Sequence, residues 1–87
     1  MRIDLTRIEK TVAKLRRKDP AIFSAIVRKI RQISLYDEHA ISHLKNFRHD
    51  LADYKRVHVG SFILVFRVGG DTIIFERFAH HDDAYKR

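Results

Sequence analysis

The stretch Tyr54–Phe78, YKRVHVGSFILVFRVGGDTIIFERF, decides the fold that this sequence can adopt. It contains three runs rich in Val, Ile and Phe, separated by short turn-forming segments. The runs are Tyr54–Val59, Phe62–Val68 and Thr72–Phe78, and the separators are Gly60-Ser61 and Gly69-Gly70-Asp71. β-branched and aromatic residues favour strands, and glycine takes the positive φ angles that tight hairpin turns require. The stretch therefore predicts a three-stranded antiparallel meander.

The turns predict the register of the meander, because opposed residues of paired strands share a face of the sheet. A two-residue turn at Gly60-Ser61 pairs Val59 with Phe62, His58 with Ile63, Val57 with Leu64 and Arg56 with Val65. The same rule at Gly69-Gly70 pairs Phe66 with Ile73, Leu64 with Phe75 and Ile63 with Glu76. A turn with an odd number of residues would reverse the third strand and move Glu76 away from His58.

This register divides the meander into two faces. The core face is almost wholly apolar and consists of Val57, Val59, Phe62, Leu64, Phe66, Val68, Ile73 and Phe75. The second face combines titratable and apolar side chains: Tyr54, Arg56, His58, Ile63, Val65, Arg67, Ile74, Glu76 and Phe78. We expect the functional groups on the second face, with Glu76 as an ion-pair partner of Arg56 or Arg77.

Two helices are predicted before the meander. Thr6-Arg7-Ile8-Glu9 has the spacing of a capping box, and Ile8, Val12 and Leu15 recur at helical spacing. Asp19-Pro20 is a start signal for a second helix that runs to about Ser34. Its apolar stripe is Ile22, Phe23, Ile26, Ile30 and Ile33. Whether Arg2–Leu5 form a short edge strand is left open.

The segment Leu35–Asp53 shows weak periodicity and is expected to be a connection that a few apolar residues, such as Leu44 and Phe47, pin to the core. The predicted fold is therefore α+β, with an N-terminal helical hairpin packed on a C-terminal antiparallel β-meander. The 87 residues suit one domain over 1–87.

Composition narrows the classes of function. Lys and Arg total 18 against 11 Asp and Glu, which gives a formal charge of +7 and favours polyanionic partners. The absence of Cys excludes disulfides, Cys-ligated zinc and thiol catalysis, and it suits the cytoplasm. The longest apolar run, Phe62–Phe66, is far shorter than the roughly 20 residues of a membrane span. We expect a protein that does not associate with membranes.

The order helix, helix, meander, with the hairpin Arg56-Val57-His58-Val59-Gly60 and the closing Ala79-His80-His81-Asp82-Asp83-Ala84-Tyr85, resembles the RelE/ParE superfamily. These are small toxins of type II toxin–antitoxin systems, and the resemblance covers essentially the whole chain. It implies a RelE-like fold and a ribosome-dependent endoribonuclease (mRNA interferase) that cleaves mRNA without a metal or other cofactor and inhibits translation. It also implies neutralisation by a RelB-like antitoxin in a heterodimer or heterotetramer.

The resemblance also implies the catalytic residues. Arg56 and His58 fall where the family places its paired basic residues, and His81 and Tyr85 fall in its closing motif. Arg56 is expected to hold the phosphate, and either histidine could serve as base or acid near neutral pH. Tyr85 could stack on a base or transfer a proton, and this choice stays open. Further RNA contacts are expected from Lys55, Arg67, Arg77 and His80.

One position departs from the family pattern. Many active RelE-like nucleases have an Arg where this chain has Ile63, and Arg67 or Arg77 would have to supply the missing charge. If neither does, the chain is a weak or inactive nuclease, a RelE-fold binding protein, or a ParE-like gyrase inhibitor. A small basic RNA-binding domain with no toxin role is a third reading, and the basic cluster Lys14, Arg16, Arg17 and Lys18 suits either phosphate contacts or a solvated helix face.

An apolar strip on the second face is too large to stay bare: Ile63, Val65, Ile74 and Phe78. We expect the antitoxin to bind there, and the alternative is that the terminus or Leu35–Asp53 covers the strip. No metal site is expected at His80-His81-Asp82-Asp83, because neighbours in an extended chain point to opposite sides.

Overall fold

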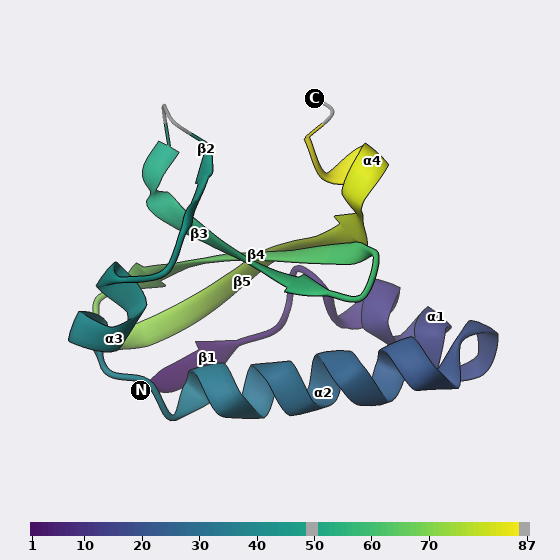
Figure 1. Ribbon diagram of the computed structural model, residues 1–87. Coiled ribbons are helices and arrows are strands. Elements are labelled where there is room, and N and C mark those ends of the chain that lie inside the picture. The colour runs from purple at the N-terminus through teal and green to yellow at the C-terminus, as the bar shows by residue number, and fades with distance from the viewer. Residues whose placement is uncertain (49–50, 86–87) are drawn as a thin grey trace.

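The computed structural model describes residues 1–48 and 51–85. In chain order the elements are β1 (Arg2–Asp4), α1 (Glu9–Lys18), α2 (Pro20–Ser34), α3 (Glu38–Ser42), β2 (Asn46–Arg48), β3 (Leu51–Val59), β4 (Phe62–Gly69), β5 (Thr72–His80) and α4 (His81–Ala84). The strands form one sheet in the order β1-β5-β4-β3-β2. β1 runs parallel to β5, and the other neighbours are antiparallel. Figure 1 shows α1 and α2 under one face of the sheet and α4 on the opposite side. The predicted α+β fold and the hairpin on the meander are confirmed, and the open question of an edge strand is settled by β1.

The predicted second helix start is confirmed, whereas the capping box is not. The Asp19 carboxylate accepts a hydrogen bond from the Ile22 N–H at 3.2 Å, and Pro20 occupies the first turn of α2. α1 begins only at Glu9, and no side chain caps it. Thr6 instead donates both its N–H and its hydroxyl to the Asp4 carboxylate, which closes the turn between β1 and α1.

The register of β3 and β4 is the predicted one. Arg56 opposes Val65, Val57 opposes Leu64, His58 opposes Ile63 and Val59 opposes Phe62. Gly60 takes the positive φ of 59° that this two-residue turn needs.

The register of β4 and β5 differs from the prediction. The turn uses Gly70-Asp71, with Gly70 at φ 63°, so Gly69 pairs with Thr72, and Phe66 pairs with Phe75. This moves the register by two residues and leaves Ile73 and Phe75 on the core face. A bulge then interrupts the ladder between Phe66 and Val65, and beyond it Val65 pairs with Arg77. The predicted pairs Phe66–Ile73, Leu64–Phe75 and Ile63–Glu76 are therefore wrong.

The bulge changes the side of the sheet to which Phe78 belongs. One extra residue, Glu76, stands on β5 where β4 supplies none, so the alternation of faces shifts by one. Phe78 consequently opposes Leu64 and joins the core, where it is buried. Its predicted place on the second face is wrong.

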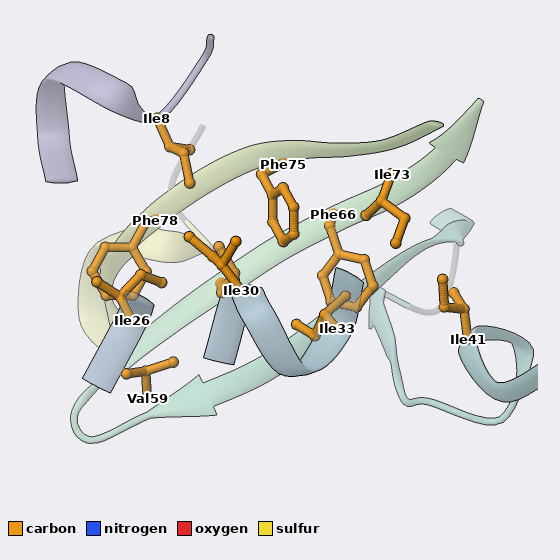
Figure 2. Close-up of a cluster of buried hydrophobic side chains, with 11 residues drawn as sticks. Ile8, Ile26, Ile30, Ile33, Ile41, Val59, Phe66, Ile73, Phe75 and Phe78 are labelled. Carbon is orange, nitrogen blue, oxygen red and sulfur yellow. The ribbon is translucent and has the colours of Figure 1, made fainter. Parts of the chain in front are cut away.

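The core lies between the helical hairpin and the core face of the sheet (Figure 2). α2 contributes Ile26, Ile30 and Ile33 to it, three of the residues predicted on its apolar stripe. The buried sheet residues are Val59, Leu64, Phe66, Ile73, Phe75 and Phe78, and Val57, Phe62 and Val68 pack against them. The predicted core face is thus confirmed in its membership.

A second, smaller cluster lies on the other side of the sheet. Ile63, Val65 and Ala84 are its buried members, and Phe47, Tyr54 and Ala79 pack against them. α4 and β2 therefore cover the middle of the second face. In residues 1–48 and 51–85, no helix is long and apolar enough to cross a membrane.

Candidate functional site

The candidate site begins with two histidines that lie more than twenty positions apart in the chain. His58 stands on β3, exposed on the second face, and His81 is the first residue of α4. The His81 N–H donates to the Ser61 carbonyl at 2.8 Å, which ties the start of α4 to the β3–β4 turn. The two imidazole rings consequently stack, with centroids 6.1 Å apart and planes 15° apart.

Tyr85 joins this pair because it follows His81 by four residues, about one helical turn. Its ring centroid lies 5.7 Å from that of His81, in an edge-on arrangement. On its other neighbour, Phe47 of β2, the ring stacks at 5.0 Å with a 19° angle between planes. We call His58, His81, Tyr85 and Phe47 the ring cluster. It brings together three of the four predicted catalytic residues.

Arg56 shares the face of His58, but its guanidinium is directed to the edge strand. Its Nε donates to the Asn46 carbonyl at 3.0 Å. Lys55 Nζ also bonds Asn46, at its Oδ1 atom at 2.6 Å. Because Lys55 opposes Phe66, it occupies a position on the other face of β3 from His58. Asn46 of β2 therefore binds both cations, and of the two only Arg56 shares the face of His58.

Arg67 forms part of an ion-paired triad. Its Nε donates to Glu76 Oε1 at 2.8 Å, and Arg7 Nη1 lies 2.5 Å from the other carboxylate oxygen. The expected ion pair of Glu76 therefore exists, with partners that the sequence did not indicate. The triad balances much of the charge of Arg67, and this weakens Arg67 as the replacement for the cation missing at Ile63.

Arg77 lies closer to the ring cluster. Its Nη1 donates to the Ala84 carbonyl at 2.7 Å, next to Tyr85 in the chain. Arg77 also lines a hollow of about 280 Å³ on the second face, together with Phe47, Tyr54, Val65 and Glu76. Of the two arginines considered for the missing charge, Arg77 is the one placed beside the predicted catalytic residues.

His80 does not join the ring cluster. It opposes Phe62, and its ring stands edge-on to the Phe62 ring at 5.7 Å. Its Nδ1 accepts the Asp82 N–H at 3.2 Å and so caps α4. The Asp82 carboxylate lies 3.7 Å from His80 Nδ1 and 3.8 Å from His81 Nδ1. The described residues contain no group of three or more His, Asp or Glu side chains that could hold a metal ion.

The predicted antitoxin-binding strip is largely covered by the protein itself. Ile63 is 0% exposed and Val65 is 2% exposed, both beneath Ala84 and the aromatic side chains around it. Phe78 is buried in the main core, and Ile74 alone of the four is half-buried. The alternative, cover by the chain's own segments, is the one observed. A partner could reach Ile63 only after displacing α4, whereas Val65 also borders a hollow on the second face.

Asn46 and Phe47 are the site residues that the sequence did not identify. A three-residue strand gives almost no periodic signal, and Phe47 was expected only as an anchor to the core. The position of β2 depends on pairing with β3, in which Asn46 is opposite Lys55, nine residues further along the chain. Nothing in the sequence pattern of β3 indicated that β2 would pair with it.

The chain is similar to a known protein over most of its length. A protein of Methanocaldococcus jannaschii, named "Putative toxin RelE4", is 42% identical over 83 residues, which cover 92% of this chain and 84% of that protein. No family model and no solved structure matches the chain. A small α+β protein with basic and aromatic side chains on the sheet face opposite the helical hairpin is the class that fold and site define. The chain belongs to the RelE family of toxins, as its motifs predicted.

Proposed function

We propose that this toxin is an endoribonuclease that cleaves ribosome-bound mRNA in a toxin–antitoxin system. The observation that supports the proposal is the ring cluster, in which His58 and His81 stack 6.1 Å apart and Tyr85 adjoins them. Two imidazoles at this separation can flank a single phosphodiester. Imidazole is the side chain best suited to exchange protons near neutral pH.

The reaction would be an internal transfer within the RNA. The 2′-oxygen attacks phosphorus while one imidazole takes its proton, and the other imidazole, protonated at the start, gives its proton to the leaving 5′-oxygen. The P–O5′ bond breaks, and the products are a 2′,3′-cyclic phosphate and a free 5′-hydroxyl. Either histidine could be the base, because both rings border the same position.

Cations around the cluster support the charge part of this reaction. Arg77 lies beside Tyr85, and Arg56 lies on the same face as His58. Either guanidinium can stabilise the crowded phosphate with paired N–H donors. Lys55, Arg67 and His80 are placed further out, so we propose that they contact flanking RNA.

A partner of opposite charge is part of the proposal. A chain of charge +7 favours an acidic antitoxin. We propose a RelB-like antitoxin that forms a heterodimer or heterotetramer with this toxin. Contact through Ile63 would require the antitoxin to displace α4, while Val65 borders the hollow and Ile74 is partly accessible in the conformation described.

The decisive experiment maps the 5′ ends of a defined mRNA incubated with antitoxin-free toxin, with and without translating ribosomes. We expect new ends within codons in the ribosome arm alone. His58→Gln and His81→Gln should each lower cleavage by about 10²–10⁴-fold, the usual contribution of a general acid or base. His39→Gln on α3, distant in sequence and exposed, is the control and should cleave normally.

A second candidate function rests on Ile63. This residue opposes His58 and is fully buried, so a hydrocarbon side chain stands where active relatives are expected to carry an arginine. A RelE-fold protein that binds without cutting, or a gyrase inhibitor, would tolerate that exchange. Folded toxin that yields no new ends in either arm would favour this candidate, and inhibition of DNA supercoiling by gyrase would identify the latter form.

A further inference from the structure

The hollow beside the ring cluster has the dimensions and lining of a site for one flat ring. It measures about 280 Å³ and is lined by Phe47, Tyr54, Val65, Glu76 and Arg77. This is slightly below the roughly 300–1,000 Å³ of pockets for whole small molecules. The five lining residues come from four neighbouring strands, so the sheet itself forms the floor of the hollow.

The lining is apolar below and charged at one side. Val65, which is 2% exposed, and the side chains of Phe47 and Tyr54 belong to the same apolar cluster. Glu76 is already ion-paired with Arg67 and Arg7, so its charge is largely balanced. Arg77 brings a guanidinium with five N–H donors. A ring that carries an anionic group therefore fits the hollow better than a neutral ring does.

Two residues connect the hollow to the proposed reaction centre. Phe47 lines the hollow and stacks on Tyr85 at 5.0 Å. Arg77 lines it too and bonds the Ala84 carbonyl at 2.7 Å. A nucleotide whose base occupied the hollow would have its phosphate directed toward the ring cluster.

We propose that this hollow binds one unpaired nucleobase of the RNA, next to the bond that is cleaved. The inference rests on the proposed function in taking RNA as the ligand of this face. Aromatic side chains bind splayed bases by stacking, and such stacking tolerates any base because every base has a π face. Tyr54 and Phe47 would be the stacking residues, and Arg77 would bind the phosphate of the same nucleotide.

The test is a binding measurement on the intact toxin that needs neither ribosome nor cleavage. Methyl NMR spectra are recorded while 5′-AMP or 5′-CMP is added, with ribose 5-phosphate as the ligand without a base. We expect the Val65 methyl signals to shift with both nucleotides and to stay in place with ribose 5-phosphate. The signals of Ile26 and Ile73 in the main core should not move.

Variants separate stacking from general packing. Tyr54→Leu should weaken nucleotide binding by about 5-fold to 150-fold, the range for losing one base-stacking residue. Tyr54→Phe should bind like the parent, because it keeps the ring. Tyr36→Leu alters a half-buried tyrosine at the end of α2 and should also bind like the parent.

Three results would overturn the proposal. The first is an unmoved Val65 signal at millimolar nucleotide, and the second is an equal shift with ribose 5-phosphate. The third is an equally strong shift with N-acetyltyrosinamide, which would identify the hollow as a site for a protein side chain. If the parent toxin shows the nucleotide-dependent shifts at Val65 but does not cleave mRNA, only the proposed nuclease function is contradicted.

Discussion

At the scale of single residues, Ile63 shows most clearly why this site differs from the expected family pattern. It opposes His58 on the second face, and α4 buries it completely. The position is therefore built for hydrocarbon, and a cation there would have to displace the helix that brings His81 and Tyr85 to the site. In the proposed nuclease, the charge expected at this position would come from elsewhere, and Arg77 is the neighbour best placed to provide it.

Ile63→Arg should therefore destabilise the toxin instead of improving it. Burying an unpaired charge belongs to the small class of substitutions that cost more than about 4 kcal/mol in the free energy of unfolding. Urea denaturation followed by circular dichroism measures the loss. Ile3→Arg, on the exposed edge of β1, should change stability by less than about 0.5 kcal/mol. A stable Ile63→Arg toxin with faster cleavage would show that α4 opens readily to admit the charge.

Asp4 has a pKa below its ordinary value. The chief cause is the hydrogen bond from the Thr6 hydroxyl, followed by that from the Thr6 N–H, because both favour the ionised carboxylate. A lowered folded-state pKa adds stability above the unfolded pKa, and this contribution disappears as the pH falls through the folded-state value.

Thr6→Val should raise the pKa of Asp4 toward its ordinary value, since the variant lacks the hydroxyl and retains the N–H. NMR titration of the Asp4 carboxyl carbon measures this change. The variant should be less stable than the parent near neutral pH, and the part of that difference due to Asp4 ionisation should vanish once the pH falls below both the unfolded and the folded-state pKa. An unchanged Asp4 titration curve would contradict the role assigned to the hydroxyl.

At the scale of elements, the bulge in β5 determines which side chains form the core. The sequence Phe75-Glu76-Arg77-Phe78 places two aromatic residues three positions apart, and a regular strand would send them to opposite faces. The extra residue at Glu76 lets both enter the core. That spacing was the available signal for a bulge, but simple alternation along the strand had assigned Phe78 to the second face.

Phe78→Ala should lower the free energy of unfolding by about 3–5 kcal/mol, the usual cost of truncating a buried Phe. Phe78→Leu should lose less than this, which keeps the measurement possible if the alanine variant fails to fold. Ile74→Ala, half-buried on the neighbouring face, is the matched control and should cost less than Phe78→Ala. Urea denaturation of the three variants gives the values, and a Phe78→Ala loss no larger than that of Ile74→Ala would place Phe78 outside the core.

The sequence predicted the elements unevenly, for physical reasons. Gly60-Ser61 permits only a short turn, so the β3–β4 register followed from it. Gly69-Gly70-Asp71 offers three turn-forming residues, and the strands selected the last two. β2, α3 and α4 are too short for periodicity to reveal them. His58, His81 and Tyr85 of the ring cluster could be predicted from their residue types and motif positions. Phe47 could not, because its place depends on the pairing of β2 with β3.

At the scale of the whole molecule, the cations fall into two layers. The helix layer carries Lys14, Arg16, Arg17 and Lys18 on α1, while Arg56 and Arg77 belong to the side of the sheet that bears the ring cluster. Figure 1 shows α1 on one side of the sheet and α4, which carries His81, on the other. Removing one charge from each layer in turn can therefore show which layer binds RNA.

The affinity of the toxin for a short single-stranded RNA should fall with salt, with a slope of log K against log salt of about −0.7 for each phosphate contacted. Contact with the sheet layer alone predicts a slope of about −1 to −3. Arg56→Gln should make the slope shallower by about 0.7, and Lys14→Gln should leave it unchanged. Fluorescence anisotropy across a salt series measures these slopes. A change with Lys14→Gln but none with Arg56→Gln would assign RNA binding to the helices.

The parallel pairing of β1 with β5 determines when the sheet can close during folding. Arg2 pairs with Thr72, so among the described residues the first strand along the chain has β5, the last strand, as its neighbour in the sheet. The helices can form while the chain is still emerging, but the sheet cannot close and His81 cannot reach His58 before β5 has left the exit tunnel. A chain that stops before β5 therefore lacks both the closed sheet and the ring cluster.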